Sequence, residues 1–101
     1  MIRITLAICM IMFSFTISHA EPSQQNIDLI HGANKEVAVI SKANVDQAFM
    51  LAKLVHRKAV EMLGKKHPET VVSARNLVKL YNTKGQADKA AKLQKEYPEI
   101  K

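Results

Sequence analysis

Three histidines beyond the N-terminal apolar segment are the residues best suited to metal or acid–base chemistry. His31, His56 and His67 are separated by 25 and 11 residues, and none forms a His-x-x-x-His pair. A zinc site on a helix needs ligands one turn apart or cysteine partners. The spacing therefore predicts no metal site, and we interpret His67 as the residue that precedes Pro68 at the start of a helix.

The serines lack the neighbours that turn a hydroxyl group into a nucleophile. Ser23 lies in a polar stretch, Ser41 and Ser73 lie within helical patterns, and none is flanked as Gly-x-Ser-x-Gly. The 3 glycines are isolated from one another, so they predict no phosphate-binding loop. We predict that the protein is not an enzyme and has no cofactor.

Binding of nucleic acid would require clustered cations together with aromatic side chains that stack on bases. The aromatic residues beyond the N-terminal segment are Phe49, Tyr81 and Tyr97. Lys65 and Lys66 form a short basic run at a predicted helix end, where the helix dipole favours cations. The sequence thus predicts no nucleic-acid partner.

Helices must position these side chains, because apolar residues recur every three or four positions and strand-like alternation is absent. The clearest helix is predicted over 45–63. Asn44 and Gln47 form its N-terminal capping pair, and Gly64 ends it.

Two further helices follow this one. The first begins at Pro68, whose fixed φ suits the first helical position, and ends at Gly85. The second is short and runs from Gln86 until the Tyr97-Pro98 pair stops it.

The stretch before residue 44 also has helical spacing, but Gly32 interrupts it at a cost of about 1 kcal/mol. The helix there begins either before Gly32 or only near it. We predict a disordered lead over 21–26, a helical domain over 27–98 and a tail over 99–101. The fold class is all-α, with about four antiparallel helices that form two hairpins.

The N-terminal segment has the organisation of a secretory signal peptide. Arg3 supplies the charge, the segment from Ile4 to Ile17 is apolar, and Ser18 and Ala20 are small residues before a cleavage site between Ala20 and Glu21. The apolar run of about 14 residues is shorter than the roughly 20 that a membrane-spanning helix needs. We therefore predict a periplasmic or secreted protein with no stable membrane span after cleavage.

Cleavage would also change the chemistry of the chain. It removes Cys9, the only cysteine, so the mature domain has neither a disulfide nor thiolate chemistry. Loss of Arg3 leaves 14 of the 15 Lys and Arg against 9 Asp and Glu, a net charge of about +5. This charge favours anionic partners, although it is also ordinary for the solubility of a small domain.

The second half of the domain contains two linked motifs, Leu63-Gly64-x-x-His67-Pro68-Glu69-Thr70 and Asn76-Leu77-x-x-Leu80-Tyr81-x-x-x-Gly85-x-x-x-x-Ala90. The pattern resembles a tetratricopeptide repeat of the variety found in kinesin light chains and in many bacterial repeat proteins. In such a repeat Gly85 gives the tight turn between helices, and the small Ala90 lets the second helix approach the first. An earlier repeat is supported mainly by its own second helix.

The resemblance implies a groove, lined by the first helices of successive repeats, that holds an extended peptide or a partner helix. The implied partner-binding residues are Val72, Arg75, Asn76, Lys79 and Asn82. Asn76 matches an asparagine with which the family often binds a peptide backbone. Arg75 and Lys79, with Lys84, would make this face basic and favour acidic or C-terminal carboxylate ligands.

On the preceding helix the matching face is apolar, with Ile30, Ala33, Val37 and Ile40, and we expect either a ligand surface or a self-association surface there. Three functions stay open. The leading one is an exported module that binds a protein or peptide partner. The alternatives are a self-associating, dimer-forming protein of the cell envelope, since two repeats leave both ends of the core uncovered, and a binder of anionic envelope polymers.

Overall fold

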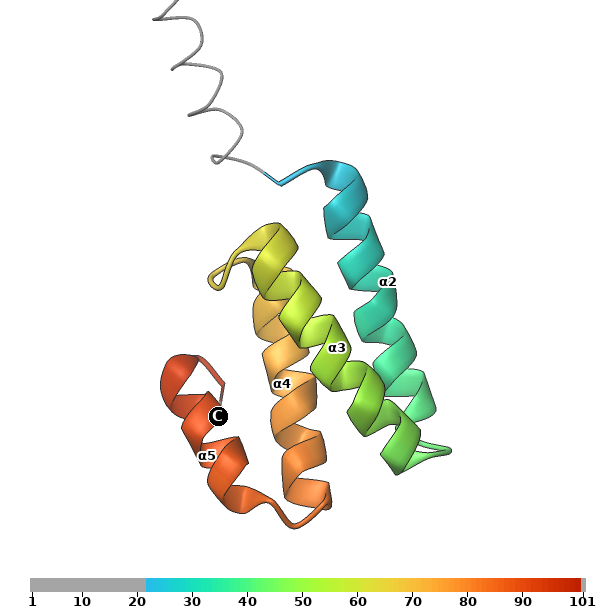
Figure 1. Ribbon diagram of the computed structural model, residues 1–101, viewed down its shortest axis with the longest axis vertical. Helices are drawn as coiled ribbons and strands as arrows, with labels where there is room; N and C mark the ends of the chain where they lie inside the picture. The colour runs from blue at the N-terminus through green and yellow to red at the C-terminus, as the bar shows by residue number, and fades with distance from the viewer. Residues whose placement is uncertain (1–21, 101) are drawn as a thin grey trace, which may run out of the picture.

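The computed structural model describes residues 22–100, and over this range the chain folds into four α-helices without a strand. The helices run antiparallel in sequence order and form two hairpins, as the fold class predicted (Figure 1). They are α2 (Gln24–Ile40), α3 (Val45–Leu63), α4 (Pro68–Thr83) and α5 (Ala87–Glu96). The predicted signal peptide and its cleavage site at Ala20 and Glu21 lie outside the described residues.

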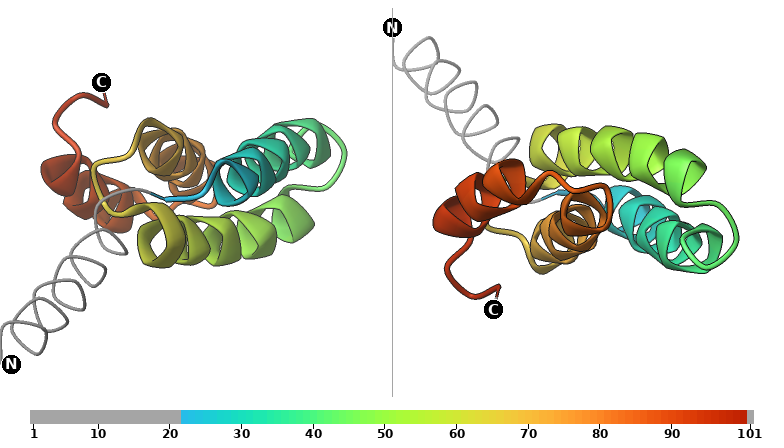
Figure 2. Two further views of the ribbon diagram at one scale, coloured as in Figure 1. Left: turned by 90° about the horizontal axis from the view of Figure 1, so that it is seen from above. Right: turned by 90° about the horizontal axis from the view of Figure 1, so that it is seen from below.

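The helices form two layers. Viewed along their axes, α2 and α4 lie side by side in one layer, and α3 packs across both of them (Figure 2). The last helix, α5, packs against α4. None of the helices within residues 22–100 combines the length and the apolarity needed to cross a membrane.

Local signals set the boundaries of α3 and α4. The Asn44 side chain accepts a hydrogen bond from the Gln47 amide at 3.0 Å, which confirms the predicted cap. The chain leaves α3 at Gly64 with φ +91°, a conformation that favours glycine. At the start of α4, Pro68 takes the first position and His67 Nδ1 accepts from the Glu69 amide at 3.1 Å. His67 is therefore a helix cap.

The first helix begins earlier than predicted. Ser23 caps it by accepting a hydrogen bond from the Asn26 amide at 3.2 Å, so residues 24–26 are helical and do not belong to a disordered lead. Gly32 lies inside the helix without breaking it. The reason is that Ile30 and Val37, one on each side of Gly32, are both buried against α3, and this burial outweighs the propensity cost.

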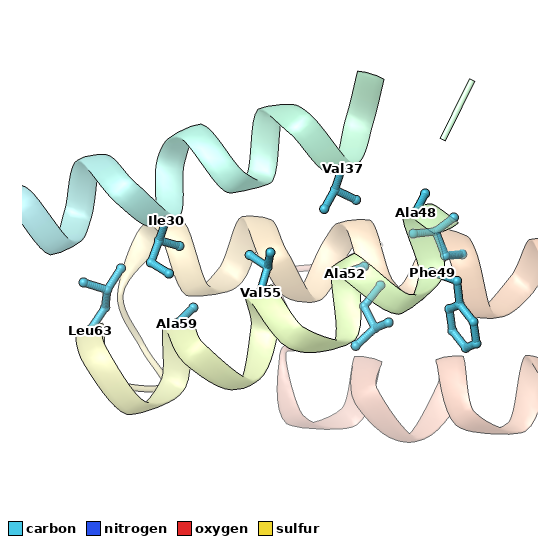
Figure 3. Packing of buried hydrophobic residues seen from close by; sticks show 10 residues of the cluster. Ile30, Val37, Ala48, Phe49, Ala52, Val55, Ala59 and Leu63 are labelled. Atoms are coloured by element: carbon cyan, nitrogen blue, oxygen red, sulfur yellow. The ribbon is translucent and has the colours of Figure 1, made fainter. Parts of the chain in front are cut away.

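Small residues on α3 let its neighbours approach closely. Ala48, Ala52 and Ala59 are almost completely buried, together with Val55, and they form the centre of the core (Figure 3). Ile30 and Val37 of α2 pack onto this face (Figure 3). Of the four residues predicted to form a ligand or self-association surface on the first helix, Ile30 and Val37 are therefore core residues, whereas Ala33 and Ile40 are only partly buried.

A second apolar cluster joins α4 to the C-terminal residues. Its buried members are Ala74, Val78, Ala90, Tyr97 and Ile100. Ile100 is only 5% exposed, so the segment predicted as a tail over 99–101 includes a residue of the core. Its burial contributes roughly 1.5–3 kcal/mol, which holds the end of the chain against α4.

Candidate functional site

The five predicted partner-binding residues all lie on α4, but the structure separates them. Arg75, Lys79 and Asn82 are exposed, whereas Val72 and Asn76 are partly buried. Asn76 and Lys79 line the same cavity. The resemblance to tetratricopeptide repeats had implied that all five line one groove.

This cavity of about 380 Å³ lies between the C-terminal halves of α2 and α4. Four apolar residues, Val37, Ala38, Val45 and Leu80, contribute to its wall, and polar groups share it with them. The full lining consists of Val37, Ala38, Ser41, Lys42, Val45, Asn76, Lys79, Leu80 and Thr83. We call this cavity the α2–α4 groove.

Sequence reasoning missed Ala38, Ser41, Lys42 and Thr83 as groove residues. The repeat register pointed to the apolar side of α2, and of the four residues it indicated there only Val37 lines this groove. The sequence signal for these groove residues was the polar pair Ser41 and Lys42 directly after α2. A polar helix end is compatible with a site shared with the basic stretch of α4.

Two cations of the groove are available to a ligand. Within residues 22–100, neither Lys42 nor Lys79 forms an ion pair with a carboxylate. Lys84, which we expected to add to the basic face, instead pairs with Asp46 at the start of α3 and lies 5.8 Å from the Phe49 ring. The positive charge of the groove therefore comes from both of its walls, with Lys42 on one side and Lys79 on the other.

A polar cluster fixes α2 against the beginning of α4. The Asn34 amide donates to the Glu69 carbonyl at 3.0 Å and to Glu69 Oε1 at 3.1 Å. Glu69 Oε2 lies 2.9 Å from His31 Nδ1. About two turns further along α4, Asn76 Nδ2 approaches the Asn34 carbonyl at 3.4 Å. Since these bonds tie the two helices together, the groove has a preformed width.

Asn76 therefore has a structural contact as well as a predicted binding role. Its 3.4 Å bond to the Asn34 carbonyl is long for an N–H···O bond and is correspondingly weak. An amide has two donor hydrogens and an acceptor oxygen, so one weak bond leaves most of its capacity for a ligand. Its position on the wall of the groove makes this capacity accessible.

His56 and Ser73 form the one serine–histidine pair among the described hydrogen bonds, with His56 Nδ1 2.8 Å from Ser73 Oγ. Ser73 Oγ donates its single proton to the Thr70 carbonyl at 2.6 Å. His56 Nδ1 must then be the donor to Ser73, which is the reverse of what a nucleophilic serine needs. Burial lowers the pKa of His56, and the charge of Glu96 opposes this effect. The pair is a packing contact between α3 and α4.

Among residues 22–100, no three His, Cys, Asp or Glu side chains are close enough together to hold a metal ion. Comparisons of the chain with protein-family models, with curated proteins and with solved structures find no match. Within the described part of the chain, the α2–α4 groove is the site whose geometry and charge best support a function.

Proposed function

We propose that this chain is an exported protein-interaction module that binds an acidic peptide segment of a partner protein in the α2–α4 groove. The observation that carries the proposal is that Lys42 and Lys79 lie on opposite walls of one partly apolar cavity. Neither lysine forms an ion pair with a carboxylate of the described residues. A peptide with a carboxylate and an apolar side chain matches both features.

The helix arrangement supports a likeness to tetratricopeptide repeats. The first helices of the two hairpins, α2 and α4, lie side by side, as the first helices of successive repeats do in that family (Figure 2). Gly85 turns the chain between α4 and α5 with φ +77°, and Ala90 is buried where α5 meets α4. These positions are the ones on which the resemblance depends.

An extended peptide suits the groove better than an enclosed small molecule. The lining of the cavity extends from Val37 to Lys42 on one wall and from Asn76 to Thr83 on the other, and polar side chains contribute to both walls. The ligand backbone would bond to Asn76, and its carboxylates would lie near Lys42 and Lys79. Export is proposed from the N-terminal sequence alone, through its charge, apolar run and small residues before Glu21.

The test compares binding of fluorescent peptides to the wild-type chain and to a variant with Asn76→Ala and Lys79→Glu. The peptides form matched sets in which Asp and Glu are replaced by Asn and Gln. We expect acidic peptides to bind at least tenfold better than their neutral counterparts, and the variant to lose this preference, since each charge-assisted bond contributes about 1.5–3 kcal/mol.

Lys95→Glu on α5 is the control, because it reverses the charge of an exposed lysine that does not line the groove. Circular dichroism of both variants checks that the helices are intact. Equal binding of acidic and neutral peptides would contradict the proposal. Equal losses in both variants would instead favour binding of anionic polymers through net charge.

A further inference from the structure

A second cavity, of about 390 Å³, lies between α2 and α3 and is almost entirely apolar. Its lining consists of Leu29, Ile30, Ala33, Leu51, Leu54, Val55, Lys58 and Met62. Leu29 on its rim is 61% exposed and Leu54 is 44% exposed. Met50, one turn before Leu54, is exposed as well. We call this surface the α2–α3 face.

The α2–α3 face is separate from the α2–α4 groove. Leu29 and Ala38 are nine residues apart on the same helix, which places them half a turn from each other. Ala38 lines the α2–α4 groove, whereas Leu29 lines the α2–α3 face. A molecule bound to one surface therefore leaves the other open.

The face is the uncovered end of the core. Ile30 and Val55, which lie at its base, are buried members of the main core cluster. On the other side of α4 the core is covered by α5. Single apolar side chains scattered over a surface are normal, but several large ones gathered in one patch indicate an interaction surface.

Charge indicates what covers this face. Its lining has one charged residue, Lys58, which pairs with Glu61 at 3.4 Å. The chain as a whole has a formal net charge of +6, but the lining of this face carries no unpaired charge, because its one lysine is paired with Glu61. Two copies can meet here without repulsion, whereas an acidic partner would be attracted to other faces.

The size of the face fits a weak dimer. Helices of 17 and 19 residues are about 26 and 28 Å long. Side by side they present a face of roughly 500 Å² per copy, or about 1,000 Å² in total. This area is near the lower limit for a specific interface, so association would depend on protein concentration.

We propose that a second copy of this chain packs against the α2–α3 face, with Leu29, Met50 and Leu54 at the centre of a two-fold interface. Both α2–α4 grooves stay open in such a dimer. A partner that displays two acidic segments would then bind to both copies with increased effective affinity. The dimer itself does not depend on the proposed ligand.

For the test, the full chain is expressed and purified in the form that the cell produces. Its mass is measured by light scattering and sedimentation over about 10–500 µM, a concentration range suited to a weak interface. We expect the mass to rise from one copy to two with concentration. Leu54→Glu should weaken this association at least tenfold. Val60→Glu is the matched control, because Val60 is also on α3, is exposed to a similar degree at 38% and is outside the lining of the face.

A wild-type chain that stays monomeric throughout, or equal effects of the two variants, would overturn the proposal. So would a dimer that Leu54→Glu leaves intact, or a different protein that copurifies on this face. Mass spectrometry shows whether residues 1–20 are retained, and a monomer that retains them would indicate that this segment covers the face instead.

Should Leu54→Glu fail to fold, single cysteines replace it as the readout. Leu54→Cys should give a dimer with a short bifunctional maleimide, whereas Val60→Cys should not. Equal cross-linking at both positions, or none at either, would overturn the proposal.

Discussion

Thr70 is the buried polar side chain whose replacement should affect stability most clearly. It is fully buried, and its hydroxyl donates to the Gly64 carbonyl at 2.7 Å, with the Ala59 carbonyl at 3.3 Å. These bonds join the start of α4 to the end of α3. Thr70→Val keeps the shape of the side chain, so it removes the hydrogen bond without creating a cavity.

The expected loss follows from the acceptor that is left behind. A buried group that loses its partner costs about 1–3 kcal/mol. The Gly64 carbonyl also accepts a long bond from the His67 amide at 3.4 Å, so the lower half of this range applies, about 1–2 kcal/mol. Small cores without disulfides rarely supply more than roughly 3–5 kcal/mol. The variant should therefore lose a large part of the free energy of unfolding.

Urea denaturation followed by circular dichroism measures this loss, and thermal denaturation should show a Tm lower by about 4–8 °C for each kcal/mol. Thr83→Val is the matched control on the same helix. Its hydroxyl is exposed and bonds to the Lys79 carbonyl at 2.9 Å, so its loss should stay within about 0.5 kcal/mol. A Thr70→Val protein as stable as the wild type, or a control that loses as much, would refute the reasoning.

Two further predictions concern the backbone and pH. Gly32→Ala should stabilise the fold by about 1 kcal/mol, and Gly64→Ala should destabilise it by a similar amount. Both new methyl groups meet open space, but only Gly64 has a positive φ. Urea denaturation that gives both changes the same sign would contradict this prediction. Burial lowers the pKa of His56 below 6.5, so the unfolded state binds more protons between the two pKa values. The free energy of unfolding should therefore fall as the pH drops through about 6.5. His56→Gln should reduce this dependence, and an NMR titration of His56 with a midpoint at or above 6.5 would exclude the mechanism.

Helix ends were predictable because their signals are local. Asn44, Gly64, Pro68 and Gly85 act on backbone groups within a few residues, so the predicted helix over 45–63 is confirmed. The start of α2 was not predictable from Gly32 alone. The burial of α2 against α3 decides whether the helix-propensity cost of this glycine is offset.

The C-terminal residues show the same limit. Ile100 follows Pro98 and one further residue, and the short polar context predicted a tail. Its burial depends on Ala74 and Val78, which lie more than 20 residues earlier on α4. Periodicity detects apolar faces within one helix, but it does not detect a single residue that packs after the helix has ended.

The sequence by itself determined the all-α class, the ends of α3 and the start of α4, and a basic stretch on α4 that includes Arg75 and Lys79. Only the tertiary structure decided which cations share a site, because Lys42 reaches the groove through the packing of α2 against α4. It also decided that Lys84 pairs with Asp46, 38 residues away. Helical hydrogen bonds act over three or four residues, whereas the distance between charges on different helices depends on how the apolar faces pack.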